Sequence, residues 1–86
     1  MVRYEILVRR SAAKELAGIP KGDLRRIVAR IRSLGDNPRL QGSEKLSGQE
    51  RYRVRQGDYR IVYSVQDAER TVCVVKIGHR REVYRA

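Results

Sequence analysis

The amino-acid sequence predicts an α+β fold, with a helical hairpin packed on one face of a mostly antiparallel four-stranded sheet. An alternating apolar segment opens the chain, two segments with helical periodicity follow, and three strand-like segments occupy the second half. The expected order is therefore strand, helix, helix, strand, strand, strand. With 86 residues the chain fits a single domain, 1–86, with a modest core.

The first strand is expected at residues 4–8, where Tyr4, Ile6 and Val8 alternate and so share one side. A short helix follows, with Ser11 as its expected N-cap and Gly18 near its end. The sequence leaves open which strand the first one pairs with.

A second helix is expected between Pro20, which suits its first turn, and Gly35, which ends it before Pro38. Its apolar positions are spaced by threes and fours and define the buried face: Leu24, Ile27, Val28, Ile31 and Leu34. Its other face is basic: Lys21, Arg25, Arg26, Arg30 and Arg32. The short connection between the two helices predicts an antiparallel hairpin.

Residues 38–50 are expected to be irregular, because they contain several Gly and Ser residues and no alternating pattern. Three strands are then expected at residues 51–56, 59–65 and 71–77, where apolar residues alternate or β-branched residues dominate. Gly57 and Asp58 form a tight hairpin turn between the first two of these strands, and residues 67–70 form a looser turn before the third.

Alternation along these strands assigns residues to faces of the sheet. The side expected to pack on the helices carries Tyr52, Val54, Tyr59, Ile61, Tyr63 and Val65. The opposite side carries Arg51, Arg53 and Arg55 on one strand and Arg60 on the next. A hairpin brings these rows together, so Arg53, Arg55 and Arg60 are expected to cluster on the face that the helices leave open.

Such a cluster predicts an anion site, since grouped like charges cost stability unless an anion binds them. The alternative is an ordinary solvated polar face. The charge of the whole chain agrees with the first interpretation: 20 Lys and Arg stand against 10 Asp and Glu, a formal net charge of +10. The partner of such a surface is a polyanion, either nucleic acid or an anionic membrane, unless the chain is simply a basic soluble protein.

Cysteine, metal and targeting signals are sparse. Cys73 is the only cysteine, so an intrachain disulfide is excluded, and its apolar neighbours indicate a small buried residue. No cluster of Asp, Glu and His suits a metal ion, and we expect neither metal nor cofactor. With no signal-peptide pattern and no apolar run near the ~20 residues of a membrane span, we expect a cytoplasmic protein without a membrane partner.

The segment after the last strand is dense in His, Arg and Tyr. His79 follows a glycine and precedes two arginines, so a solvated imidazole that exchanges protons near neutrality is expected. Tyr84 is either a hydrophobic anchor or a platform on which an RNA base stacks.

Four motifs resemble the RelE/ParE toxin superfamily, over nearly the whole chain. They are Lys45-Leu46-Ser47-Gly48, Tyr52-Arg53-Val54-Arg55, Gly57-Asp58-Tyr59-Arg60-Ile61-Val62-Tyr63 and Gly78-His79-Arg80-Arg81-Glu82-Val83-Tyr84. The last of these resembles the RelE branch. The resemblance implies a type II toxin–antitoxin system toxin that cleaves mRNA in the ribosomal A site and thereby inhibits translation.

Site residues follow from this resemblance and from the faces of the sheet. The expected catalytic residues are Arg55, Arg60, His79, Arg80 and Tyr84. The expected RNA-binding residues are Lys45, Arg51, Arg53 and Arg81. The arginines would hold the phosphate while the 2′-hydroxyl of the RNA attacks it, which needs no metal. Arg53 and Arg55 stand where relatives commonly have Lys, and an arginine effectively cannot accept a proton. His79 is therefore the preferred proton-transfer group.

The resemblance also implies a partner: an acidic, RelB-like antitoxin that forms a hetero-oligomer with the toxin. Two alternatives remain open. A ParE-like toxin would inhibit DNA gyrase without nuclease chemistry, and a non-catalytic basic module would only bind nucleic acid.

Overall fold

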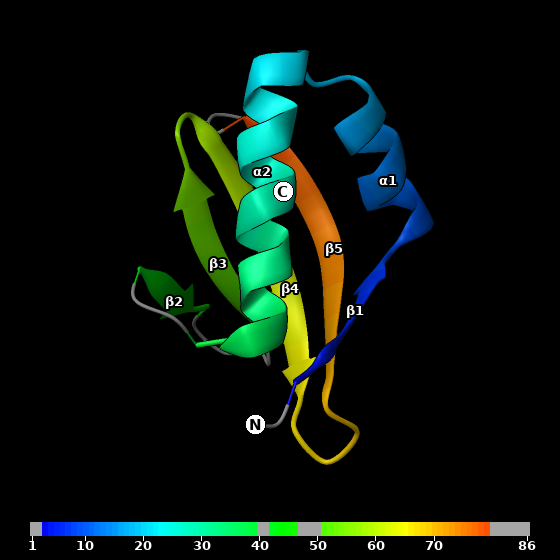
Figure 1. Cartoon of the computed structure of the whole chain (residues 1–86), viewed down its shortest axis with the longest axis vertical. Coiled ribbons are helices and arrows are strands. Elements are labelled where there is room, and N and C mark those ends of the chain that lie inside the picture. Colours follow the sequence, from blue (N-terminus) through cyan, green and yellow to red (C-terminus); the bar gives the residue numbers. More distant parts are fainter. Residues whose placement is uncertain (1–2, 40–41, 47–50, 80–86) are drawn as a thin grey trace.

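The computed structural model describes residues 3–39, 42–46 and 51–79, and within them it contains two helices and a five-stranded mixed sheet. Both helices lie on the same face of the sheet (Figure 1). The elements are β1 (Glu5–Val8), α1 (Arg10–Ala17), α2 (Lys21–Asp36), β2 (Ser43–Lys45), β3 (Arg51–Gln56), β4 (Tyr59–Gln66) and β5 (Thr71–His79). The strands lie in the order β1-β5-β4-β3-β2. The predicted α+β class is confirmed.

The sheet has one strand more than predicted. β2 lies in the segment 38–50, which was expected to be irregular, and it pairs antiparallel with β3. Its three residues, Ser43, Glu44 and Lys45, are all polar and too few to show a pattern, so only the pairing with β3 defines the strand. β1 pairs in parallel with β5, and the remaining pairs are antiparallel. The first strand therefore adds to the edge formed by the last one.

The first helix begins two residues earlier than its expected cap allows. Arg9, not Ser11, occupies the N-cap position, and no side chain caps the helix. The backbone N–H of Arg9 donates to the carbonyl of Val74 at 2.9 Å, which extends the contact of β1 with β5 by one residue. The Arg9 carbonyl then accepts the first helical hydrogen bond from Ala13, so strand pairing and helix share one residue. Ser11 as the N-cap was wrong for this reason.

Gly35 lies inside α2, which continues through Asp36, so the predicted end at Gly35 was one residue short. Its role is close approach: the Tyr4 N–H donates to the Gly35 carbonyl at 2.8 Å. A Cβ added at Gly35 would lie 3.2 Å from the Tyr4 carbonyl oxygen, tighter than ordinary van der Waals contact. The glycine therefore lets the N-terminal segment pack directly against the last turn of α2.

The core lies between the helices and the sheet, on the side that the alternation predicted. It combines Ile27, Ile31 and Leu34 of α2 with Val54, Ile61, Tyr63, Val72, Val74 and Ile77 of the sheet. The buried Tyr63 hydroxyl donates to the Pro38 carbonyl at 2.7 Å, which satisfies the polar end of a large core side chain. None of the described helices is long and apolar enough to cross a membrane.

Arg39 forms a clasp between the segment after α2 and the turn between β4 and β5. Its guanidinium donates to both carboxylate oxygens of Asp67, at 3.0 and 2.9 Å, and its Nε donates to the Tyr52 hydroxyl at 3.0 Å. The Tyr4 hydroxyl donates to the same carboxylate at 2.6 Å. The hydrogen bonds from Arg39 and then Tyr4 lower the pKa of Asp67 to about 2. The clasp consists of Arg39, Asp67, Tyr4 and Tyr52.

Candidate functional site

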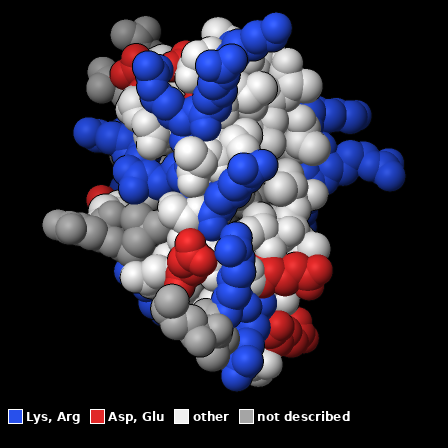
Figure 2. Space-filling view, in the orientation of Figure 1, with Lys and Arg blue, Asp and Glu red and all other residues white. Residues whose placement is uncertain are grey.

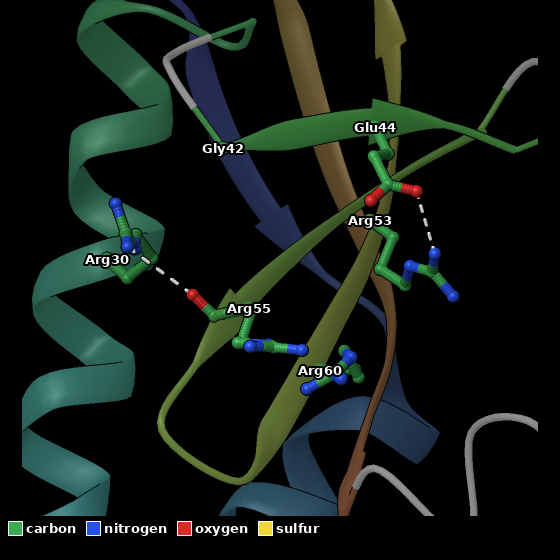
Figure 3. A pocket seen from close by; sticks show the side chains of 6 residues that line it. All are labelled: Arg30, Gly42, Glu44, Arg53, Arg55 and Arg60. Carbon is green, nitrogen blue, oxygen red and sulfur yellow. Dashed lines mark hydrogen bonds and ion pairs between the residues drawn. The ribbon is translucent and has the colours of Figure 1, made fainter.

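A cavity of about 460 Å³ lies beside β3, where α2, β2 and β4 also contribute side chains (Figure 3). We call it the arginine cavity. Its lining residues are Arg30, Gly42, Glu44, Arg53, Arg55 and Arg60. Four guanidinium groups from three elements therefore surround one hollow, with one carboxylate among the described residues that line it. Such a lining favours a ligand with several negative charges.

The sheet register places the strand arginines together. Arg55 and Arg60 are direct cross-strand partners, and Arg53 is two residues along β3 on the same face. Like charges directly opposite one another destabilise a sheet, so an anion between them would stabilise this arrangement. Arg60 is only 4% exposed, and its partner on β5 is Gly78, which has no side chain to compete for the space. The predicted cluster of Arg53, Arg55 and Arg60 is present.

Glu44 is the acidic member of the cavity, and sequence reasoning missed it. It lies opposite Arg53 in the β2–β3 register, and its Oε2 accepts from the Arg53 guanidinium at 2.8 Å. The Glu44 side chain is 68% exposed, whereas that of Arg53 is 19% exposed. The carboxylate therefore sits at the mouth of the cavity. No sequence signal marked Glu44, because the three-residue strand that carries it was not predicted.

Arg30 is the second residue that sequence reasoning did not place in the site. It was expected on the outer basic face of α2, yet its guanidinium reaches toward β3 and donates to the Arg55 carbonyl at 3.4 Å. The last β2–β3 register pair joins Ser43 to Val54, so Arg55 lies just beyond the end of β2. Arg30 therefore contacts the backbone at the point where strand pairing stops (Figure 3). This contact depends on how α2 sits over the sheet, which periodicity alone does not define.

Two predicted RNA-binding residues fall on opposite faces. Arg51 is exposed and lies across from Ser64, on the same face of β3 as Arg53. Lys45 is exposed but lies across from Tyr52, a residue packed against the core. The sheet alternation thus directs Lys45 to the helix side and separates it from the arginine cavity.

His79 does not join the arginines. It lies across from Tyr59 on β4, with the two rings edge to face at 5.8 Å between centroids. His79 lines a separate hollow of about 300 Å³, together with Lys14, Glu15 and Ile19 of the helical region. Core residues on a regular strand are an even number of positions apart, but a β-bulge separates the core residues Val74 and Ile77 of β5 by three positions. His79 is two residues after Ile77, so its side chain lies on the same, helix-facing side of the sheet. His79, the predicted proton-transfer group, therefore lies on the opposite side of the sheet from the arginine cluster.

The remaining predicted residues, Arg80, Arg81 and Tyr84, lie outside the described residues. Within residues 3–39, 42–46 and 51–79, no group of three or more His, Cys, Asp or Glu side chains could hold a metal ion. The described side chains that line the arginine cavity offer guanidinium groups and one carboxylate.

Comparison with known proteins places the chain in a family. Residues 6–84 match the family described as the ParE toxin of type II toxin–antitoxin systems, parDE. The chain belongs to the ParE toxin family. This family lies in the RelE/ParE superfamily, as the sequence motifs predicted.

Relatives of this ParE-family toxin carry RelE names. A candidate RelE1 toxin of Methanocaldococcus jannaschii is 27% identical, over 98% of both chains. The toxin in the archaeal RelE–RelB complex of Pyrococcus horikoshii OT3 is 29% identical, with a TM-score of 0.82 over 93% of this chain and 97% of that one. A chain of the RelBE2 toxin–antitoxin complex of Mycobacterium tuberculosis is 26% identical, with a TM-score of 0.82 over 93% of this chain and 94% of that one.

Proposed function

We propose that this toxin is a metal-independent endoribonuclease that cleaves mRNA in the ribosomal A site and so inhibits translation in the cytoplasm. One observation carries the proposal: Arg53, Arg55 and Arg60 converge on one cavity with a carboxylate at its mouth. Guanidinium groups held on adjacent strands are preorganised donors for a phosphate. The RelE names of the relatives support the same activity.

The proposed reaction uses the RNA as its own nucleophile. The 2′-hydroxyl loses its proton and attacks the adjacent phosphorus, and the P–O5′ bond breaks. The leaving 5′-oxygen takes a proton from water, so the products are a 2′,3′-cyclic phosphate and a 5′-hydroxyl. Arg55 and Arg60 stabilise the extra negative charge of the pentacovalent intermediate, and Arg53 holds this phosphate or the next one. Fixed donors act best where charge develops in the transition state.

Removal of the 2′-hydroxyl proton requires a base, and Glu44 is the candidate in the described cavity. The three strand arginines cannot accept a proton near neutrality. His79 packs against Tyr59 on the other side of the sheet. Glu44 lies at the cavity mouth with one carboxylate oxygen on Arg53, which orients it. Arg80 and Tyr84 keep their predicted roles at the phosphate and on a neighbouring base.

Ribosomes programmed with a defined mRNA provide the test. Purified toxin should yield fragments ending in a 2′,3′-cyclic phosphate, with and without chelator, and the fragments should be absent with Arg55→Ala/Arg60→Ala. Intact mRNA in the presence of folded wild-type toxin would reject the nuclease.

A second candidate, gyrase inhibition without nuclease chemistry, is favoured by the ParE description of the matching family. It predicts that the toxin blocks DNA supercoiling by gyrase while leaving ribosome-bound mRNA intact. Supercoiling and mRNA cleavage measured with the same protein sample decide between the two activities, and a toxin that shows neither would be a binding module.

An acidic antitoxin is the proposed partner. The similar chains from Pyrococcus horikoshii OT3 and Mycobacterium tuberculosis belong to toxin–antitoxin complexes. Carboxylates of the antitoxin would pair with the arginine cavity and speed association, while apolar contacts supply most of the affinity. A hetero-oligomer of toxin and antitoxin is the expected resting form.

A further inference from the structure

A second hollow adjoins the arginine cavity on the side of α2. It has a volume of about 330 Å³ and is lined by Arg26, Ala29, Arg30, Ser33 and Gln56. Arg30 lines both hollows, and Gln56 directly follows Arg55 at the end of β3. The two hollows therefore share Arg30 of α2, next to the end of β3.

We propose that Arg26 and Arg30 bind backbone phosphates of the RNA strand next to the scissile one, so that the strand passes from the arginine cavity over the end of β3 onto α2. This inference rests on the proposed function, because it extends the path of the same strand. The ligand class is a phosphodiester backbone, read without regard to base.

The helix surface has the shape that such a path needs. Arg26 and Arg30 are four residues apart, so they lie one above the other on one face of α2. Ala29 and Ser33 are small and line the hollow beside them. The Ser33 hydroxyl donates to the Arg30 carbonyl at 2.6 Å, which keeps this side chain close to its own helix. A hollow that has two guanidinium groups and small side chains beside them leaves room for an RNA phosphodiester backbone.

Arg30 has hydrogen-bonding capacity left for a phosphate. Its one hydrogen bond within the described chain goes to the Arg55 carbonyl and is long, at 3.4 Å. Its Nε is buried and has no hydrogen-bond partner there. An unsatisfied buried donor costs free energy, and a charge-assisted bond from the same guanidinium to a phosphate would offset that cost.

Arg26 is also available. Its ion pair with Asp23 is 3.7 Å long, and the two side chains are 68% and 46% exposed. Exposed pairs of this kind are weak, so a phosphate can replace the carboxylate. Beyond Arg26, basic side chains gather over α2 on the face shown in Figure 2. Lys21 and Arg25 are exposed on this helix, which extends the favourable potential along the path.

The test uses two non-cleavable 2′-O-methyl oligonucleotides, a trinucleotide that fills only the arginine cavity and a dodecanucleotide that also reaches α2. Arg26→Ala should weaken the dodecanucleotide several-fold and lower the slope of log Kd against log salt by about 0.7, the value for one lost phosphate contact on a single strand. Affinity for the trinucleotide should not change. Arg32→Ala is the matched control, since Arg32 lies on the same helix but lines neither hollow.

Two further variants sharpen the result. Asp23→Asn frees Arg26 and should tighten the dodecanucleotide, the opposite sign to Arg26→Ala. Arg30→Ala should weaken it as Arg26→Ala does. Because Arg30 also contacts β3, Arg26→Ala remains the deciding variant if Arg30→Ala disturbs the fold.

The outcomes separate this inference from the proposed function. If the wild type cleaves mRNA but Arg26→Ala and Arg32→Ala bind the dodecanucleotide equally well, the path over α2 is wrong and the nuclease stands. If Arg26→Ala weakens only ribosome binding, the phosphates belong to ribosomal RNA and the path is again wrong. Because the oligonucleotides cannot be cleaved, a length-dependent loss would support the path even for a toxin without nuclease activity.

Discussion

The arginine cavity and the Arg39 clasp use the same side chain in opposite ways. In the clasp, Arg39 is matched by the full carboxylate of Asp67 and by the Tyr52 hydroxyl. In the cavity, four arginines share one lining carboxylate, that of Glu44, among the residues described. Among the described residues, the clasp pairs its one arginine with a carboxylate, whereas the lining of the cavity holds more guanidinium groups than carboxylates.

This difference predicts that Arg39 is a structural arginine and that the cavity arginines are functional ones. A guanidinium paired with a carboxylate and a hydroxyl joins two segments of the fold and has little left to offer a ligand. A group of arginines with one carboxylate among them lowers stability until an anion arrives. Changes in the cavity should therefore reduce activity, and changes in the clasp should reduce stability.

The largest expected effect comes from Arg60→Ala. Arg60 is buried and faces Arg55 across the β3–β4 pair. Loss of one preorganised donor costs about 10²–10³-fold in rate. Cleavage of mRNA on programmed ribosomes should fall by that factor, with the circular dichroism spectrum unchanged. Arg39→Ala, which also removes one arginine, should retain activity. Equal losses of cleavage rate from the two variants would contradict the assignment of a functional role to the cavity and a structural role to the clasp.

Glu44→Gln tests the only acid in the described cavity lining. If Glu44 accepts the 2′-hydroxyl proton, the rate should fall by about 10²-fold, the lower range for general base catalysis. Glu69→Gln, in the exposed turn between β4 and β5, is the matched control. Tighter RNA binding with an unchanged rate would instead make Glu44 a counter-ion of Arg53.

Alternation along two strands was sufficient to predict the centre of the site. Val54 and Ile61 are buried on the helix side, so Arg53, Arg55 and Arg60 must lie on the other side once β3 and β4 pair. The hydrophobic period of two is strong on these strands because one face forms the core. The same reasoning predicted the core itself and the position of α2 over it.

The rest of the site depends on tertiary contacts that leave little trace in the sequence. Glu44 enters through a three-residue polar strand, and Arg30 enters because α2 crosses the end of β3. For His79, a local irregularity in the strand makes the face predicted from alternation wrong. Counting in twos from the buried Val72 and Val74 would direct His79 to the arginine side, but the bulge shifts the count by one residue.

A smaller effect is expected from Asp67→Asn in the clasp. The pKa of Asp67 is depressed to about 2 from 3.8, so its contribution to stability is present above pH 4 and is lost as the pH falls toward 2. Because the pair is exposed, Asp67→Asn should lower the Tm by only a few degrees at pH 7. The difference in Tm between variant and wild type should shrink between pH 4 and pH 2, and mRNA cleavage at neutral pH should be retained. A difference that stays constant down to pH 2 would mean that the Asp67 charge does not stabilise the clasp.

A small effect on activity is expected from His79→Gln, at the residue that the sequence favoured for proton transfer. In the structure its ring packs edge to face on Tyr59, and the hollow that contains it is lined from the helix side. The imidazole therefore does not line the arginine cavity. The variant should cleave ribosome-bound mRNA within about 3-fold of the wild-type rate. This change is small compared with the ~10²-fold loss that is typical when a general acid or base is removed. Its pH–rate profile should follow the wild type. Tyr59→Leu, which removes the ring that His79 packs against, is the companion variant and should likewise leave the pH profile unchanged. A large loss of rate in His79→Gln, with a flattened pH profile and an intact fold, would place the imidazole at the RNA and would make the helix side of the sheet part of the active site.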